Sequence, residues 1–409
     1  MLKALAPVAS LLVGVAILLT GQGLQGTLLP VRATLEQFSV FGVGFIGGTY
    51  FLGFTLGCLF GARMIRSVGH VRVFAAMTAA ASAAPLLHGL WINIWSWALL
   101  RSVSGFCFAV LYMVIESWIN EKASNENRGT IFSAYALINM TVLAVGQQML
   151  LLEDPRTLTL FAVASVLVSL AAVPVVLSTS EHPRLVKSVS LNIAYLYRTS
   201  PAGMLGALAT GLANGSFWAL APVFAASYSD DLALAAGVMT ASVLGGAISQ
   251  WPLGHFSDRI DRRYVMASIS FGSAAMAIAI WIFVDRLVPL HIAMLCAAWG
   301  AMAFPLNSIS VAHANDKARP NEYVMLSGGL LLMYGMGAVA GPIISATLMG
   351  SVGAAGLFLF TALIHTVLLL YILNRVLREA PPSADDHVPF DDALAGVTTT
   401  SQVYEEGMK

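Results

Sequence analysis

"APVASLLVGVAILLTGQGLQGTLLP", residues 6–30, contains no charged side chain. A helix needs about 20 consecutive apolar residues to cross the hydrocarbon core of a bilayer. Comparable runs recur along the sequence, which is 58% hydrophobic and only 10% charged, whereas soluble chains are about a quarter charged. Because irregular backbone cannot face lipid, the sequence predicts an all-α integral membrane protein.

Charged or Gly/Pro/Asn-rich breaks divide the chain into twelve predicted transmembrane helices. Six precede residue 179 and six follow residue 200. The predicted spans are 7–29, 40–62, 71–90, 95–119, 129–152 and 157–178, then 201–225, 232–253, 264–284, 289–313, 323–349 and 355–377.

The positions of Lys and Arg predict the orientation. With the N-terminus inside, seventeen of the 21 basic residues fall in inside segments, three fall in outside loops, and Arg101 lies within a span. Cytoplasmic loops carry such an excess of positive charge. We therefore expect a multi-pass protein of the bacterial inner membrane with both termini in the cytoplasm.

Composition divides the chain into four segments. Residues 1–178 and 201–378 hold the spans, 179–200 form a cytoplasmic linker whose second part is compatible with a short interfacial helix, and 379–409 are acidic and turn-rich. Such a composition is typical of a disordered tail rather than of a docking element.

The two sets of spans resemble each other. "LLPVRA" (28–33) matches "LAPVFA" (220–225), a shift that also carries Gln22-Gly23 onto Asn214-Gly215, and "NEKA" (120–123) matches "NDKA" (315–318). Repeats of this kind are typical of transporters built as two bundles around a midplane site. The sequence predicts two pseudo-symmetric six-helix bundles.

"GHFSDRIDRR", residues 254–263, resembles the Gly-x-x-x-Asp-Arg-x-x-Arg-Arg signature of the major facilitator superfamily. The corresponding first-half loop, residues 62–72, keeps Gly69 and Arg72 but has Arg66 where the family usually has Asp. "RSVSG" (101–105) resembles the family's Arg-x-x-x-Gly motif, and "IESWINEKASNENRG" (115–129) resembles the span-four exit of one bacterial branch. The resemblance implies alternating access, with charged loops latching the cytoplasmic gate.

Two latch pairs follow from the departure at Arg66. We predict that Asp258 pairs with Arg128 and that Arg66 pairs with Glu322, the alternative being that Arg66 and Glu322 are solvated interface charges.

Glu116 is the one acid placed inside a predicted span. Because a buried charge in a membrane is costly, Glu116 is interpreted either as a proton carrier or as a member of the gate network. The gating candidates are Arg66, Glu116, Arg128, Asp258, Arg259 and Glu322.

By analogy with the family, spans one, four, seven and ten line the cavity. Their mid-membrane side chains combine uncharged amides with aromatic rings, which suits a neutral amphipathic or aromatic solute. Arg101 either binds a carbonyl or anion or holds helices together. The substrate-binding candidates are Gln22, Gln25, Arg101, Tyr112, Asn214, Phe217, Trp218, Trp299 and Asn307.

These features favour a secondary transporter or facilitator of a small neutral solute, such as riboflavin, with uptake preferred. A proton-coupled multidrug exporter is the first alternative, although span five lacks the exporters' Gly-Pro motif; a non-transporting sensor or lipid-handling protein of the same fold is the second. No enzyme motif or metal-ligand spacing is found, so we expect no catalytic residue and no cofactor. The expected partners are the bilayer, a small-molecule substrate and, as an alternative, protons; zero net charge argues against nucleic acid. We expect a monomer.

Overall fold

The computed structural model describes residues 8–123, 128–176, 193–317, 323–378 and 390. Eleven helices within these residues are long and apolar enough to cross a membrane, and a shorter apolar helix covers Thr159–Val175. The first-half helices are α2 (Ala9–Leu35), α3 (Val40–Val68), α4 (His70–Leu90), α5 (Ile94–Lys122), α6 (Arg128–Gln148) extended by η2 (Met149–Leu152), α7 (Thr159–Leu170) and α8 (Ala172–Val176). The short helix α9 (Ile193–Thr199) lies in the predicted linker. The second-half helices are α10 (Pro201–Ala226), α11 (Leu232–Ser257), α12 (Arg262–Phe283) extended by η3 (Val284–Arg286), α13 (Pro289–Ala303), α14 (Pro305–Asn315), α15 (Tyr323–Val352) and α16 (Gly356–Arg378).

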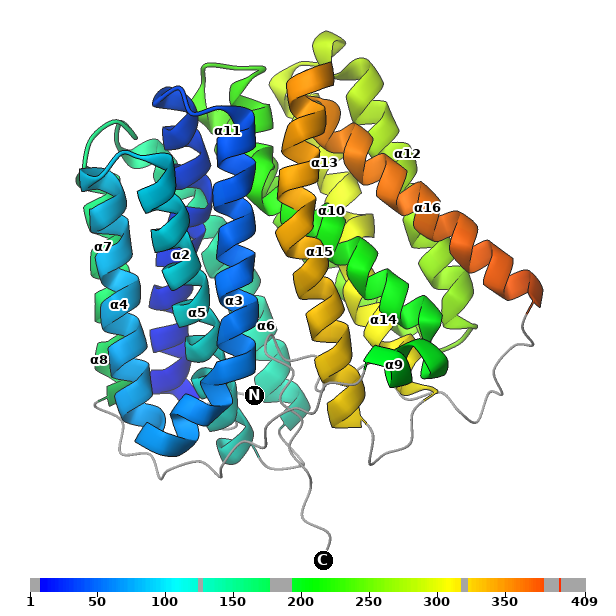
Figure 1. Cartoon of the computed structure of the whole chain (residues 1–409), viewed down its shortest axis with the longest axis horizontal. Coiled ribbons are helices and arrows are strands. Elements are labelled where there is room, and N and C mark those ends of the chain that lie inside the picture. Colours follow the sequence, from blue (N-terminus) through cyan, green and yellow to red (C-terminus); the bar gives the residue numbers. More distant parts are fainter. Residues whose placement is uncertain (1–7, 124–127, 177–192, 318–322, 379–389, 391–409) are drawn as a thin grey trace, which may run out of the picture.

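The two halves stand side by side, with α2–α8 in one and α10–α16 in the other (Figure 1). We call the end where α3 meets α4 and α11 meets α12 the basic end, because those connections carry Arg63, Arg66, Arg259, Arg262 and Arg263. It is the lower end in Figure 1. The other end is the opposite end. Helices α2, α10 and α15 all run from the basic end to the opposite end.

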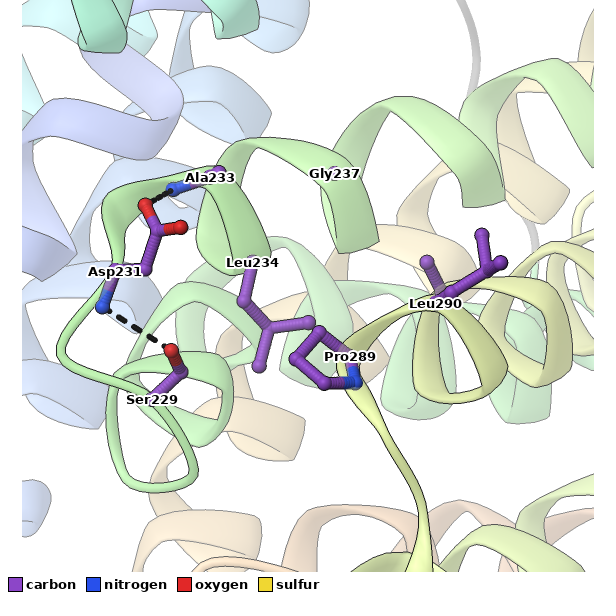
Figure 2. A pocket seen from close by; sticks show the side chains of 8 residues that line it. Ser229, Asp231, Ala233, Leu234, Gly237, Pro289 and Leu290 are labelled. Atoms are coloured by element: carbon purple, nitrogen blue, oxygen red, sulfur yellow. Dashed lines mark hydrogen bonds between the residues drawn. The ribbon is translucent and has the colours of Figure 1, made fainter.

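Polar side chains at the helix starts explain where several helices begin. Ser39, Asn93 and Ser200 accept hydrogen bonds from backbone N–H groups in the first turns of α3, α5 and α10. Such bonds satisfy donors that have no partner within the helix. Asp231 does the same for α11, accepting from the Ala233 N–H at 2.9 Å. Figure 2 shows this cap beside a pocket that is lined by the first turns of α11 and α13.

The predicted span 289–313 corresponds to two consecutive helices that form one membrane span, Pro289–Asn315. Helix α13 ends at Ala303 and α14 begins at Pro305, with Phe304 between them. Proline has no N–H for the hydrogen bond to the preceding turn, and its ring clashes with that turn. The helical hydrogen bonding is therefore locally broken near the middle of the span, whereas Phe304 itself keeps helical backbone angles.

Glycines set the closest helix contacts inside the first half. A methyl group at Gly53 of α3 would overlap the carbonyl oxygen of Ser102 on α5, and one at Gly105 of α5 would overlap that of Tyr50 on α3. Small residues let helix backbones approach in this way where lipid supplies no hydrophobic driving force. This contact fixes Tyr50 and the α5 side chains at one level of the bundle.

Candidate functional site

Gln22 joins three helices of the first half. Its Nε2 donates to the hydroxyl oxygen of Tyr50 on α3 at 2.9 Å, and the hydroxyl of Tyr112 on α5 donates to its Oε1 at 2.8 Å. All three side chains are buried or half-buried. The structure thus brings together two predicted site residues, Gln22 and Tyr112, through a tyrosine that the sequence prediction missed.

Arg101 belongs to the same cluster. Its guanidinium carbon lies 4.3 Å from the centroid of the Tyr50 ring, a distance at which a cation is attracted to the ring face. Phe54, one turn along α3 from Tyr50, packs against the Tyr112 ring at 6.3 Å between centroids. We call Gln22, Tyr50, Arg101 and Tyr112 the first-half cluster.

The first-half cluster retains unused donors. A glutamine amide carries two N–H donors and a tyrosine hydroxyl carries one. Among the hydrogen bonds described, Gln22 uses one amide hydrogen on Tyr50, and Tyr50 acts there only as an acceptor. One amide hydrogen and one hydroxyl hydrogen are therefore available to water or a ligand.

Gln25 and Asn214 are buried amides with unpartnered atoms. Gln25 is 1% exposed, and within the described chain neither its Nε2 nor its Oε1 has a hydrogen-bond partner; the same holds for Oδ1 of Asn214. An unsatisfied buried polar group costs about 1–3 kcal/mol. Helices α2 and α10, which carry these residues, pack against each other across the boundary between the halves.

The second-half candidates form an aromatic cluster around the α13–α14 break. The half-buried Trp218 stacks on Phe304 with ring centroids 5.5 Å apart and planes 5° apart. Phe217 and Trp299 also stack on each other, at 4.7 Å, but both are fully buried in the core. In this conformation Phe217 and Trp299 support the layer behind Trp218 and Phe304, and Asn307 is half-buried on α14.

Helix α3 closes the boundary between the halves at the opposite end. A methyl group at Gly44 would overlap Ala346 of α15, and one at Gly47 would overlap Ala219 of α10. Thr55, farther along α3, faces Gly335 of α15. We call this contact the glycine seam.

A hydrogen-bonded clasp closes a second part of the same end. Gln148 of α6 donates from Nε2 to the Thr240 hydroxyl of α11 at 2.8 Å and to the carbonyl oxygen of Ala236 at 3.2 Å. Thr240 in turn donates to Oε1 of the buried Gln147 at 3.2 Å. These neutral groups link the two halves, and we call them the amide clasp.

The basic end of the second half is organised by Arg262. This fully buried guanidinium contacts Asp316 at 2.8 Å, the Ser257 hydroxyl at 2.9 Å and Asp258 at 2.9 Å. Asp258 also accepts hydrogen bonds from the backbone N–H of Phe390. In this structure the predicted latch residue Asp258 is therefore engaged by its own half.

Next to it, Asp261 caps α12 and pairs with Arg263. Partial burial by itself raises the pKa of Asp261, but the hydrogen bonds and charge of Arg263 outweigh it and hold that pKa below its ordinary value. Arg259 is exposed, and its Nη2 lies 3.1 Å from Nε2 of His255.

The structure describes the remaining gating candidates only in part. Arg66 is exposed near the end of α3, and Glu116 is 1% exposed on α5, one turn from Tyr112. Arg128 begins α6, but its side chain is outside the described part of the chain, as is Glu322. The two predicted latch pairs stay predictions.

Sequence reasoning missed Tyr50, Phe304 and Thr240. Tyr50 lies in "GVGFIGGTYFLGF" (42–54), whose closely spaced glycines indicate tight helix contacts, and Phe304 precedes Pro305. The glycine spacing and the proline could therefore have pointed to Tyr50 and Phe304. No sequence pattern points to Thr240, because only the tertiary structure pairs it with Gln148.

Comparisons with known proteins agree with this architecture. The family model described as Major Facilitator Superfamily matches residues 11–201 and 203–404. An uncharacterized MFS-type transporter of Yersinia pestis is 26% identical over 390 residues, covering 92% of this chain and 98% of the relative. The uncharacterized MFS-type transporter YcaD of Escherichia coli is 27% identical over 392 residues, with the same coverage.

Solved structures share the fold. The nucleoside transporter NupG aligns with a TM-score of 0.73 at 12% identity, covering 90% of this chain and 98% of that one. A bacterial homologue of the human lysosomal transporter Spinster aligns with a TM-score of 0.67 at 13% identity, covering 93% and 97%. With the family match spanning both halves, the chain belongs to the major facilitator superfamily and is a multi-pass membrane transporter with an alternating-access fold.

Proposed function

We propose that this transporter moves a small neutral solute with a planar ring, with uptake as the favoured direction. The observation that carries the proposal is the first-half cluster, in which Gln22 bridges two tyrosines and still has a donor to offer. Neutral donors and ring faces bind such a solute by hydrogen bonds and stacking.

The charges near the cluster fit a neutral ligand. Arg101 is the cation of the cluster, and its guanidinium lies over the Tyr50 ring, whose face attracts the cation and holds it against the protein. A flat vitamin such as riboflavin and a nucleoside share the required chemistry, a planar ring with polar edges and hydroxyl groups. The fold-related NupG is titled a nucleoside transporter.

We assign the second-half contacts to Trp218 and Asn214. The stacked pair of Trp218 and Phe304 offers a ring surface next to Pro305, where the α13–α14 span lacks one backbone hydrogen bond. Gln25 and Asn214 hold buried amide atoms without a partner in the described chain. A bound solute or water would satisfy them.

We infer that the structure corresponds to the inward-facing state. The basic end is cytoplasmic by the positive-inside rule, and the glycine seam and the amide clasp join the halves at the opposite end. A solute bound at the cluster would then leave toward the cytoplasm.

A thermal-shift screen of the purified protein tests the substrate class. The panel contains riboflavin, uridine, adenosine, lipophilic cations, sugars and dicarboxylates. A ligand at a hundredfold excess over its Kd adds about 2.7 kcal/mol of stability. Stabilisation by the neutral ring compounds supports the proposal, and stabilisation by ions alone contradicts it.

Matched variants then locate the site. Gln22→Ala and Tyr112→Phe should reduce the ligand-induced shift and raise the KM of uptake. Tyr197→Phe is the control, because Tyr197 is an exposed tyrosine on α9. If the two cluster variants respond to the ligand like Tyr197→Phe, the cluster is not the binding site.

Proton-coupled export is the second candidate, favoured by one observation. Glu116 is a buried acid one turn from Tyr112 on α5, and intramembrane acids commonly carry protons. Glu116→Gln should abolish proton-driven flux while leaving exchange of solute intact. If the variant keeps its dependence on the proton gradient, Glu116 belongs to the gate instead.

A further inference from the structure

Phe390 lies in the acidic segment beyond the last helix, yet it is 2% exposed. It is the one residue of 379–409 that the structure describes. Its ring packs against Gly254 at the basic end of α11, closely enough that a methyl group at Gly254 would overlap the ring. Residues of α12 and α16, among them Met266 and Leu368, complete the same hydrophobic cluster.

The backbone of Phe390 adds a directed contact. Its N–H donates to both carboxylate oxygens of Asp258, at 2.9 and 3.1 Å. Arg262 contacts the same carboxylate at 2.9 Å. Hydrogen bonds between an ionised acceptor and a backbone N–H are among the stronger ones in proteins. Asp258 is therefore held by the tail and by Arg262 together.

We propose that the basic end of the second half contains a docking pocket for the chain's own tail, and that docking restrains Asp258 from closing the gate. The occupant is Phe390, and the acidic segment that carries it in the sequence is "DDHVPFDDAL", residues 385–394. With the tail docked, the basic end stays open. With the tail released, Arg262 alone holds Asp258, which can then exchange that contact for its predicted latch partner in the first half, Arg128 at the start of α6.

The sequence around Phe390 fits this role. Asp385, Asp386, Asp391 and Asp392 flank it, whereas the loop at its pocket carries Arg259, which is exposed. Opposite charges speed the encounter of two surfaces. Helix α16 ends at Arg378, and the twelve residues from there to Phe390 can span up to roughly 40 Å, so the pocket is within reach of the chain that fills it.

The ring should dominate the affinity. Full burial of a phenylalanine side chain corresponds to about a tenfold to hundredfold change in a binding equilibrium. Phe390→Ala should loosen docking by that factor. Gly254→Ala should have the same effect from the pocket side, because its methyl group would occupy the position of the ring. The Gly254→Ala substitution changes the pocket and leaves the tail sequence unchanged.

A peptide-binding measurement tests the docking alone. A fluorescein-labelled peptide of residues 385–394 is titrated into the full-length Phe390→Ala protein, and anisotropy gives the Kd. We expect binding at least about tenfold tighter than for the same peptide carrying Ala in place of Phe, and weaker binding to the unchanged protein, whose own tail competes. Equal binding of the two peptides overturns the proposal.

An accessibility measurement tests the effect on the gate. Cys58, Cys107 and Cys296 are the three cysteines; they are replaced, and Ala346→Cys is introduced at the glycine seam, where a membrane-impermeant maleimide reacts only when the opposite end opens. Phe390→Ala and Gly254→Ala should each raise the labelling rate severalfold. Addition of the peptide should lower the labelling rate of the Phe390→Ala protein toward that of the protein with the unchanged tail.

Tyr404→Ala is the control, a ring deletion in the same tail outside the docking segment. If Phe390→Ala labels no faster than Tyr404→Ala, or if the peptide binds without lowering the rate, the tail does not restrain the gate. The inference rests on alternating access, on the inward-facing assignment and on the predicted latch role of Asp258, and not on the proposed solute, so a failed substrate screen leaves both measurements valid. Should Phe390→Ala elute as aggregate, Gly254→Ala decides the question.

Discussion

Thr240→Val removes two of the three hydrogen bonds of the amide clasp without changing the shape of the side chain, and the bond from Gln148 to the Ala236 carbonyl oxygen remains. The Thr240 hydroxyl accepts one hydrogen bond from Gln148 at 2.8 Å and donates one to Gln147 at 3.2 Å. Valine has the same branched form but can neither donate nor accept. The glycine seam lies on other helices and is untouched by the change.

The expected magnitude follows from those two bonds. A hydrogen bond contributes about 0.5–1.5 kcal/mol net, so losing two destabilises the closed arrangement by about 1–3 kcal/mol. The open arrangement loses little, because water then satisfies the same groups. The balance between closed and open should shift toward open by a factor of roughly 5 to 150.

Labelling of Ala346→Cys from outside measures this shift at a site remote from the substitution. Thr141→Val is the matched control, since Thr141 is exposed on α6 and its hydroxyl donates within its own helix, to the carbonyl oxygen of Leu137. We expect faster labelling for Thr240→Val than for Thr141→Val. Equal rates for the two would refute the reasoning, and so would full additivity of Thr240→Val with Gln148→Leu in a double-mutant cycle.

Three further predictions concern helix packing, the dependence of stability on pH, and the predicted latch. Gly105→Ala should lower the Tm by the equivalent of about 1–3 kcal/mol, because its methyl group meets the Tyr50 carbonyl; Gly350→Ala, with open space around it, should leave the Tm unchanged or higher. The pKa of Asp261 lies below its ordinary value of 3.8, so its ion pair should contribute stability above that value and lose it as the pH falls through the lowered pKa; a plot of Tm against pH should show this loss, and Asp261→Asn should lack it. Arg66→Glu and Glu322→Arg should each impair solute flux, and the double reversal should restore it; continued loss in the double variant argues for two solvated charges.

Sequence patterns predicted most of the architecture because membrane spans depend on composition. An apolar run such as residues 6–30 forms a helix in a bilayer wherever it occurs, and α2 follows at Ala9–Leu35. The ends were harder to place: α3 continues to Val68, beyond the predicted 62. The bilayer core sets a minimum length, but the helix stops where Gly69, with φ 94°, ends it.

The site could be predicted by residue type but not by partner. Gln22 and Tyr112 stand out as polar groups in apolar runs, yet nothing local pairs them through Tyr50. The sequence also does not show how deeply each side chain is buried. It therefore could not distinguish the fully buried Phe217 and Trp299 from the half-buried Trp218. Consecutive residues on a helix point about 100° apart, and only the packing of α10 against its neighbours decides whether Phe217 or Trp218 stays accessible.

The two ends of the molecule differ in the charge of the side chains that they expose. At the opposite end, the glycine seam and the amide clasp that join the halves are neutral, whereas the basic end exposes charged side chains such as Arg66 and Arg259. Dissolved salt screens exposed charges over about 10 Å at 0.1 M and has little effect on van der Waals contacts or amide bonds. Ionic strength on the basic side should therefore tune one gate while leaving the other almost untouched, so the resting conformation depends on the salt content of a single compartment.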